Sequence, residues 1–137
     1  MLRANAFLEE RFAGGLASAH GLALKEVLML LHVQHAEGSR LSRVDLAKRL
    51  HVSASTVTRM AQPLEKMGMI GREPDARDAR FTYVVLTKSG KTLLKHAKDT
   101  LERMSADFFR DRWSEDDLAS LNALLGRITA SLPGNLN

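Results

Sequence analysis

Apolar residues recur at helical spacing in two short stretches near the middle of the chain. In residues 43–50 the apolar positions are Val44, Leu46, Ala47 and Leu50. In residues 53–67 they are Val57, Met60, Ala61, Leu64 and Met67. Only His51-Val52-Ser53 lies between the two stripes, which leaves room for no more than a tight turn. The pattern therefore predicts a helix-turn-helix.

The opposite face of the second predicted helix is polar. It carries small hydroxyls, an amide and a guanidinium: Ser55, Thr56, Thr58, Arg59 and Gln62. Hydroxyl and guanidinium groups on an exposed helix can bond base edges in the DNA major groove. This face is the candidate base-reading surface.

The spacing of apolar residues elsewhere predicts four further helices. These are expected over residues 2–16, over residues 22–36, from Thr87 to about Phe108, and after Ser114. Gly14-Gly15 should weaken or bend the end of the first helix. The second is apolar around much of its circumference, so burial on more than one side is expected.

Capping residues support these helix boundaries. Four hydroxyl residues stand at predicted helix starts: Ser42, Ser53, Thr87 and Ser114. Gly68 follows the second helix of the helix-turn-helix, where a left-handed residue is common. His51 occupies the turn between the two helices and tolerates a left-handed backbone better than most residues. Pro63 removes the amide that would bond the Arg59 carbonyl, so a kink is predicted there.

Composition limits the class of protein. A chain of 137 residues with 45% hydrophobic and 26% charged residues fits one globular domain with a real core. There is no apolar run near the ~18 residues of a membrane span and no signal-peptide pattern, so a cytoplasmic protein is expected. The absence of cysteine excludes disulfides and thiol-based sensing. No nucleophile elbow, phosphate-binding glycine loop or metal-ligand triplet is present, which argues against an enzyme.

Charge is distributed unevenly along the chain. Residues 40–95 contain twelve Lys and Arg against five acidic residues, a net charge of +7. Because the whole chain carries +4, the remainder carries −3. The basic excess coincides with the helix-turn-helix pattern and indicates a surface for phosphates.

A hairpin is predicted directly after the helix-turn-helix. Strands at residues 69–72 and 81–86 enclose the polar tip Glu73-Pro74-Asp75-Ala76-Arg77-Asp78-Ala79-Arg80. At such a tip Arg77 can reach into a narrow, A·T-rich minor groove. Asp75 could hold the Arg77 guanidinium through a charge-assisted hydrogen bond.

These motifs together resemble the MarR family of winged helix-turn-helix regulators, from about Phe7 to Leu132. The most specific match is Asp75-x-Arg77-x-x-Arg80 followed by Val84-x-Leu86-Thr87-x-x-Gly90. Further matches lie in the two central helices: Leu46-Ala47, Val52-Ser53, Ser55-Thr56-Val57-Thr58-Arg59, Leu64-Glu65-Lys66 and Gly68.

The resemblance implies a mainly α fold with a small β-hairpin wing and dimerisation helices at both termini. Residues 1–137 would form one MarR-type domain, with the winged helix-turn-helix lobe at about 22–90. Residues 1–21 and 91–137 would supply the dimerisation helices. The implied function is a homodimeric, ligand-responsive repressor on a pseudo-palindromic double-stranded DNA operator. Its effector would be a small, often aromatic or anionic molecule.

The DNA-binding residues expected from the residue pattern and the resemblance are Arg43, Ser53, Ser55, Thr56, Thr58, Arg59, Asp75, Arg77 and Arg80. The segment from Ser53 to Arg59 would enter the major groove and Arg77 the minor groove, with Asp75 and Arg80 supporting the wing. The effector is expected near Phe12, Leu16, His20 and His32. Lys48 and Lys66 are further candidates for phosphate contacts.

Two alternatives stay open at this stage. His32 and His35 stand three residues apart on a helix and could share a metal ion, although no carboxylate-rich cluster accompanies them and no metal or other cofactor is expected. The chain could also be a constitutive architectural DNA-binding protein without a sensory pocket. Target genes, effector identity and repression versus activation are not encoded in these patterns.

Overall fold

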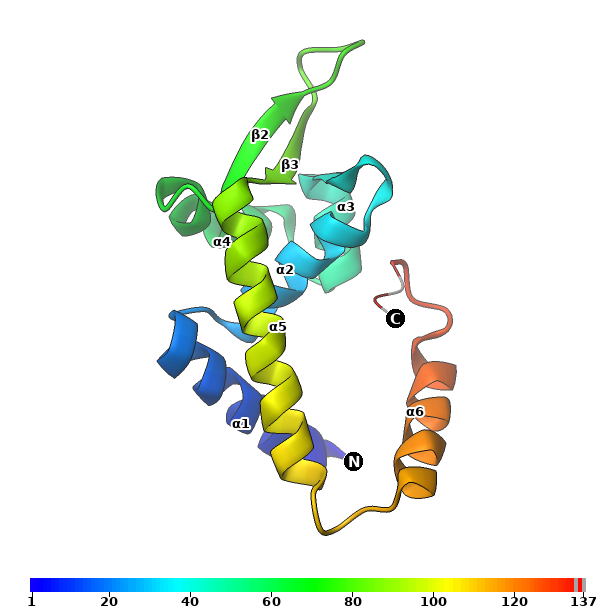
Figure 1. Cartoon of the computed structure of the whole chain (residues 1–137). Helices are drawn as coiled ribbons and strands as arrows, with labels where there is room; N and C mark the ends of the chain where they lie inside the picture. Colours follow the sequence, from blue (N-terminus) through cyan, green and yellow to red (C-terminus); the bar gives the residue numbers. More distant parts are fainter. Residues whose placement is uncertain (135, 137) are drawn as a thin grey trace.

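The computed structural model describes residues 1–134 and 136, and it shows a mainly helical chain with one small sheet (Figure 1). The elements in chain order are α1 (Leu2–His20), α2 (Leu24–His35), a 3-10 turn η1 (Glu37–Ser39), β1 (Arg40–Ser42), α3 (Arg43–Leu50), α4 (Ala54–Lys66), β2 (Ile70–Pro74), β3 (Thr82–Leu86), α5 (Lys88–Phe109) and α6 (Glu115–Thr129). The expected fold class is confirmed: the chain is mainly α-helical, and a small β-hairpin wing completes the winged helix-turn-helix.

The sheet has three antiparallel strands in the order β1-β3-β2, one strand more than the pattern predicts. Strands β2 and β3 form the hairpin, with Ile70 opposite Leu86 and Pro74 opposite Thr82. The additional strand, β1, pairs Leu41 with Val84. Three residues are too short for a periodic signal, and the pairing joins segments about 43 positions apart, so sequence pattern alone could not find β1.

The core lies where α2, α3, α4, the sheet and the first half of α5 meet. Its members with no exposed surface include Leu30, Leu46, Val57, Leu64 and Leu94. Helix α2 is the most deeply placed, as its all-round apolar pattern predicts, with Val27, Met29, Leu30 and Val33 fully buried. The helix-turn-helix is thus seated on a packed base.

The predicted helix caps form. The hydroxyls of Ser42, Ser53, Thr87 and Ser114 each accept a hydrogen bond from the amide three residues later. His51 has φ +52° and Gly68 has φ +71°, so both adopt the left-handed conformation expected of them. Helix α4 continues to Lys66 beyond Pro63, and the turn with His51 holds α3 and α4 in fixed relation.

Helix α1 is longer than predicted. It runs through Gly14-Gly15 and ends at His20, where Gly21 adopts φ +65°. The predicted end near Leu16 is therefore wrong, and α1 packs against α5. A Cβ at Gly15 would overlap the side chain of Met104 on α5, so glycine allows α1 and α5 to approach closely.

Helix α6 stands apart from the rest of the molecule (Figure 1). It follows α5 through an extended connection, and none of its residues is buried. Large apolar side chains are exposed along this terminal part of the chain: Trp113, Leu124, Leu125, Ile128 and Leu132. A helix of this amphipathic pattern ordinarily buries its apolar face. Among the described residues, the apolar face of α6 is therefore left largely exposed.

None of the described helices is by itself long and apolar enough to cross a membrane. Helices α1 and α2 reach that length and composition only together, across a bend of 80°.

Candidate nucleic-acid interface

The first turn of α4 carries a cluster of hydroxyl groups at the molecular surface. Ser53 Oγ accepts from the Thr56 amide at 3.1 Å and lies 2.9 Å from the hydroxyls of both Ser55 and Thr56. Arg59 Nη2 donates to Thr56 Oγ1 at 3.2 Å. Ser53, Ser55 and Arg59 are exposed and Thr56 is half-buried. The cluster offers donors and acceptors together at a helix N-terminus, where the helix dipole favours anions.

Thr58 and Arg43 point their polar groups at one another instead of outward. Thr58 Oγ1 donates to the Ala54 carbonyl at 3.1 Å and accepts from Arg43 Nη1 at 3.4 Å. Arg43 Nη2 also lies 3.7 Å from a carboxylate oxygen of Glu65. Both predicted DNA contacts are therefore engaged within the protein and half-buried, whereas Ser55 and Arg59, although also hydrogen-bonded, are exposed.

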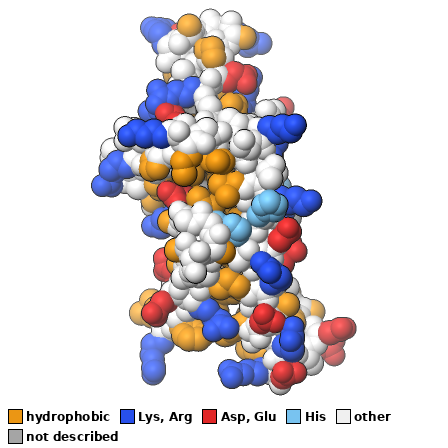
Figure 2. Space-filling view, turned by 60° about the vertical axis from the view of Figure 1, so that its left-hand side comes forward, with side chains coloured by type: hydrophobic (Ala, Val, Ile, Leu, Met, Phe, Trp, Pro, Cys, Tyr) orange, Lys and Arg blue, Asp and Glu red, His pale blue; other side chains and the backbone are white. Residues whose placement is uncertain are grey.

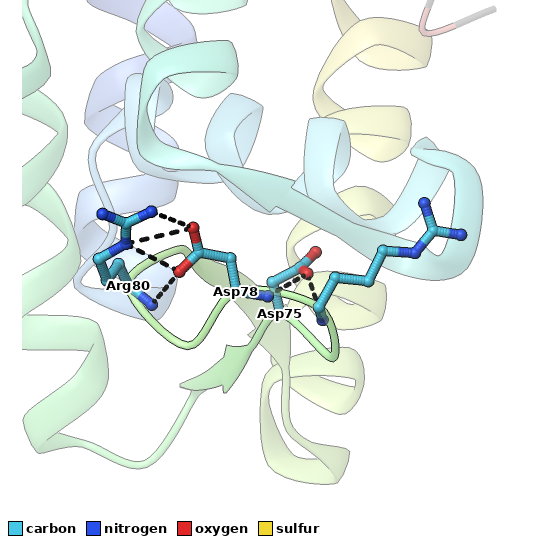
Figure 3. Close-up of polar contacts among 4 residues, drawn as sticks. Asp75, Asp78 and Arg80 are labelled. Carbon is cyan, nitrogen blue, oxygen red and sulfur yellow. Dashed lines mark hydrogen bonds and ion pairs between the residues drawn. The ribbon is translucent and has the colours of Figure 1, made fainter.

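The tip of the wing, the hairpin formed by β2 and β3, is shaped by Asp75 (Figure 3). Its Oδ1 accepts from the backbone amides of Arg77 at 2.7 Å and Asp78 at 3.1 Å, and its Oδ2 accepts from the Tyr83 hydroxyl at 2.8 Å. These hydrogen bonds, the one from the Arg77 amide most of all, hold the pKa of Asp75 below its ordinary value. Asp75 thus orders the turn backbone, and the predicted bond to the Arg77 guanidinium does not form.

Arg77 and Arg80 play different parts at this tip. Arg80 pairs with Asp78, with Nη2 2.7 Å from Oδ2 and Nε 3.0 Å from Oδ1, and the pair closes one side of the loop (Figure 3). The Arg77 side chain is exposed, and no partner for its guanidinium is found among the described residues. Of the two cations, Arg77 is the one free to engage an outside anion.

A chain of polar contacts ties the wing to the base of the sheet. Arg40 on β1 donates to Glu73 at 2.8 Å, and its guanidinium lies 4.6 Å from the centre of the Tyr83 ring. Tyr83 in turn donates to Asp75, and this bond raises the pKa of the Tyr83 hydroxyl. Strand β1, which sequence reasoning missed, therefore supports the residue that shapes the tip.

The helix-turn-helix and wing share one charged surface. Figure 2 shows Lys and Arg side chains predominating around the upper part of the molecule, with acidic side chains more evenly mixed among them below. This agrees with the net charge of +7 over residues 40–95. An exposed hydroxyl cluster, the exposed Arg77 side chain on the wing and a basic surround make this surface the candidate nucleic-acid interface.

Comparison with known proteins gives the same assignment. The sequence profile described as the MarR family matches residues 22–82. The chain is 27% identical over 117 residues to the HTH-type transcriptional regulator YdgJ of Bacillus subtilis, covering 85% of this chain and 67% of that one. It is 39% identical over 69 residues to the transcriptional regulator AdcR of Streptococcus pyogenes, covering 50% of this chain and 44% of that one.

Solved structures share the fold over nearly the whole chain. A MarR-family regulator of Streptomyces coelicolor, Sco3205, solved in complex with DNA, superposes with a TM-score of 0.80 at 24% identity, covering 94% of this chain and 80% of that one. The regulator BldR of Sulfolobus solfataricus gives a TM-score of 0.75 at 25% identity, with 92% and 89% covered. The chain belongs to the MarR family. It is accordingly a transcriptional regulator and not an enzyme.

This MarR-family chain has a cavity of about 190 Å³ beside the helix-turn-helix. It lies between α2, the turn after α3 and the segment that follows α6. Its lining combines Arg49 and two histidines with apolar residues; the full set is His32, Arg49, His51, Thr129, Leu132, Pro133, Gly134 and Leu136. The segment approaches closely, because a Cβ at Gly134 would lie 2.7 Å from Arg49 Nη1. A small anion with an apolar body fits such a lining.

Of the four predicted effector residues, His32 alone lines this cavity. Leu16 has no exposed surface and belongs to the core, so it cannot line a pocket. His20 Nε2 lies 2.8 Å from Thr100 Oγ1 and links α1 to α5. Phe12 is half-buried on α1 and lines none of the described cavities. Arg49 and His51 were missed because a segment about 80 residues later brings them into the site, which leaves no local sequence signal.

His32 is buried and incompletely bonded. It is 6% exposed, and its Nδ1 has no hydrogen-bond partner among the described residues. Burial, then the charge of Arg49, then His35 lower the pKa of His32 below its ordinary value of 6.5. His32 is therefore neutral in the folded protein near neutral pH. No group of three metal-binding side chains occurs among the residues that the structure describes, so a His32–His35 metal site gains no support.

The lowered pKa of His32 makes the free energy of unfolding depend on pH. Between the lowered pKa of the folded state and pH 6.5, His32 binds a proton in the unfolded chain but not in the folded chain. The free energy of unfolding therefore falls as the pH falls through this window. We expect denaturant titrations at pH 7.5 and 5.5 to show a smaller acid-induced loss for His32→Gln than for the wild type. His35→Gln, at an exposed position on the same helix, should retain most of the wild-type loss; an unchanged loss in His32→Gln would contradict the assignment.

Proposed function

We propose that this MarR-family chain is a sequence-specific repressor that binds a pseudo-palindromic DNA operator as a homodimer in the cytoplasm. The observation that carries the proposal is the pairing of two exposed probes on one lobe. These are the hydroxyl cluster with Arg59 at the start of α4 and the unpaired Arg77 at the wing tip. A helix start suits the major groove and a free guanidinium suits the minor groove.

The two kinds of contact divide affinity from specificity. Lys48 and Lys66, both exposed or half-exposed on the helix-turn-helix, would bind phosphates and make affinity fall with salt. Ser55, Thr56 and Arg59 would discriminate bases, each good contact contributing roughly 1–3 kcal/mol. Thr58 would take a smaller share than the sequence pattern suggests, because its hydroxyl already bonds Ala54 and Arg43.

The exposed apolar face of α6 supports the homodimer. Its Leu124, Leu125 and Ile128 side chains are exposed, and so is Phe7 of α1, whose ring centre lies 6.1 Å from that of Phe108. A second copy would cover both surfaces by the same contacts, as two-fold symmetry requires. Two lobes so joined would read half-sites about one helical turn, roughly 34–36 Å, apart.

The cavity at His32 supports control by a small anionic effector, as against constitutive binding. It joins the turn of the helix-turn-helix, through Arg49 and His51, to the segment that follows α6. A molecule held there would favour one placement of the lobe relative to the dimer helices. It could release DNA only by favouring a placement that the operator does not fit.

Loss of Arg77 tests the DNA-binding proposal. Duplexes are first selected from a random pool by the wild-type protein, and binding is then titrated by gel shift. Arg77→Ala should bind the selected duplex about tenfold more weakly, because one charge-assisted contact is removed. Its elution volume should match the wild type. Arg80→Ala, whose side chain is paired with Asp78, is the matched variant and should lose less. Equal affinity of Arg77→Ala and wild type would refute the wing assignment.

Removal of the last helix tests the dimer. A chain ending at Asp111 lacks Trp113 and all of α6, and should sediment as monomers or aggregates because the symmetric apolar contact is gone. Leu124→Asp, a single charge on the exposed face, should weaken association in the same direction. A monodisperse dimer from both variants would overturn the interface.

Benzoate, a small aromatic anion, is a suitable probe of the cavity. Adding it to the complex with the selected duplex should weaken DNA binding, and Arg49→Gln should abolish most of that response because the cavity loses its cation. Benzyl alcohol, neutral and of similar size, serves as the control ligand. If benzoate and a panel of related carboxylates leave DNA binding and the His32 ring resonances unchanged, the constitutive alternative stands instead.

A further inference from the structure

We propose that Glu65 is a positioning residue that fixes the recognition helix α4 relative to the wing by gripping Arg72 and Arg43. We call these three residues the Glu65 clamp. The inference rests on the proposed function, since it concerns how the two DNA probes are held at one spacing. A basic surface that binds phosphates has no electrostatic need for an acidic residue at position 65.

The contacts of Glu65 join three elements. Its Oε1 accepts from Arg72 Nε and its Oε2 accepts from Arg72 Nη2, both at 2.8 Å, so the guanidinium is held by two parallel bonds. Arg43, the first residue of α3, is also near, with its Nη2 3.7 Å from Glu65 Oε1. Arg72 belongs to β2, the strand that leads into the wing. One carboxylate thus connects α3, α4 and the wing strand.

The Glu65–Arg72 pair is partly exposed, so its proposed effect is on geometry more than on stability. The Glu65 side chain is 21% exposed, against 29% for Arg43 and 52% for Arg72. The bond from Arg72 is the first cause that lowers the pKa of Glu65, so the carboxylate is charged throughout the neutral range. A two-bonded Arg–carboxylate pair constrains orientation as well as distance.

The clamp restrains the wing at a point away from the backbone bonds that join it to α4. The turn between α4 and β2 is fixed at its base, where Met69 N donates to the Leu64 carbonyl and Thr87 bonds the Gly68 and Met69 carbonyls. These bonds lie close together at one end of the hairpin. The Glu65–Arg72 pair lies away from these bonds. It is therefore placed to keep the wing from rotating about the base of the hairpin.

The clamp and simple electrostatics predict opposite outcomes. Glu65→Gln removes a negative charge from the basic segment, so charge alone predicts tighter binding to any DNA. The clamp predicts weaker binding to the selected duplex, because the two probes no longer share a fixed spacing. Binding to a scrambled duplex, which needs no such spacing, should stay equal or tighten.

The test measures affinity for the selected and the scrambled duplex by fluorescence anisotropy at one salt concentration. For Glu65→Gln the ratio of the two affinities should fall about tenfold. Asp45→Asn makes the same charge change at an exposed position on α3, where asparagine can still accept the hydrogen bond from Ser42 Oγ, and its ratio should stay within about twofold. In hydroxyl-radical footprints, Glu65→Gln should lose more protection in the minor groove contacted by the wing than in the major groove contacted by α4.

Arg72→Lys keeps the net charge and removes the two-bonded geometry. It should reproduce part of the loss in the affinity ratio, with thermal unfolding close to wild type, and it carries the test if Glu65→Gln fails to fold. An unchanged ratio in these variants, while the wild type still selects a sequence, would overturn the clamp and leave the proposed function intact. A wild type that selects no sequence would overturn both.

Discussion

The burial of one face of α4 is the constraint on which the interface depends. Val57, Ala61 and Leu64 have no exposed surface, and together they fix the rotation of α4 about its own axis. Because helix positions follow one another at about 100°, this burial determines which side chains face outward. Ser55 and Arg59 stand opposite the buried stripe for that reason. A core requirement thus decides which chemistry the helix can present.

The acidic residues of the basic segment serve to order its cations and its loops. Asp75 holds backbone amides, Asp78 holds Arg80, Glu73 holds Arg40 and Glu65 holds Arg72. Each such pair is exposed in part and contributes little to stability on its own. Their common effect is to fix geometry while leaving other cations, Arg77 among them, free to bind. The ability of this surface to bind an anion therefore depends more on which of its cations are already paired than on its net charge.

Local sequence rules predicted most of the helices and the hairpin, because caps and apolar spacing are properties of neighbouring residues. They failed where distant segments meet. Strand β1 exists through pairing with β3, and α1 continues to His20 through Gly15, which packs against Met104 of α5. At the candidate site the exposed positions of Ser55, Arg59 and Arg77 followed from pattern and resemblance. The engagement of Thr58 by Arg43, and the true partners of Asp75, depend on side-chain geometry that no spacing encodes.

The same distinction separates the lobe from its control. The cavity at His32 takes one wall from α2 and the helix-turn-helix and another from the segment after α6. In the proposed homodimer α6 packs on a second copy, so the position of the segment after α6 depends on the position of the dimer helices. Arg49, close to Gly134, belongs to the lobe. A ligand between them would contact both bodies at once, which is the condition under which binding energy can be converted into a change of lobe spacing. The buried His32 also lines this cavity, and its Nδ1 has no hydrogen-bond partner among the described residues.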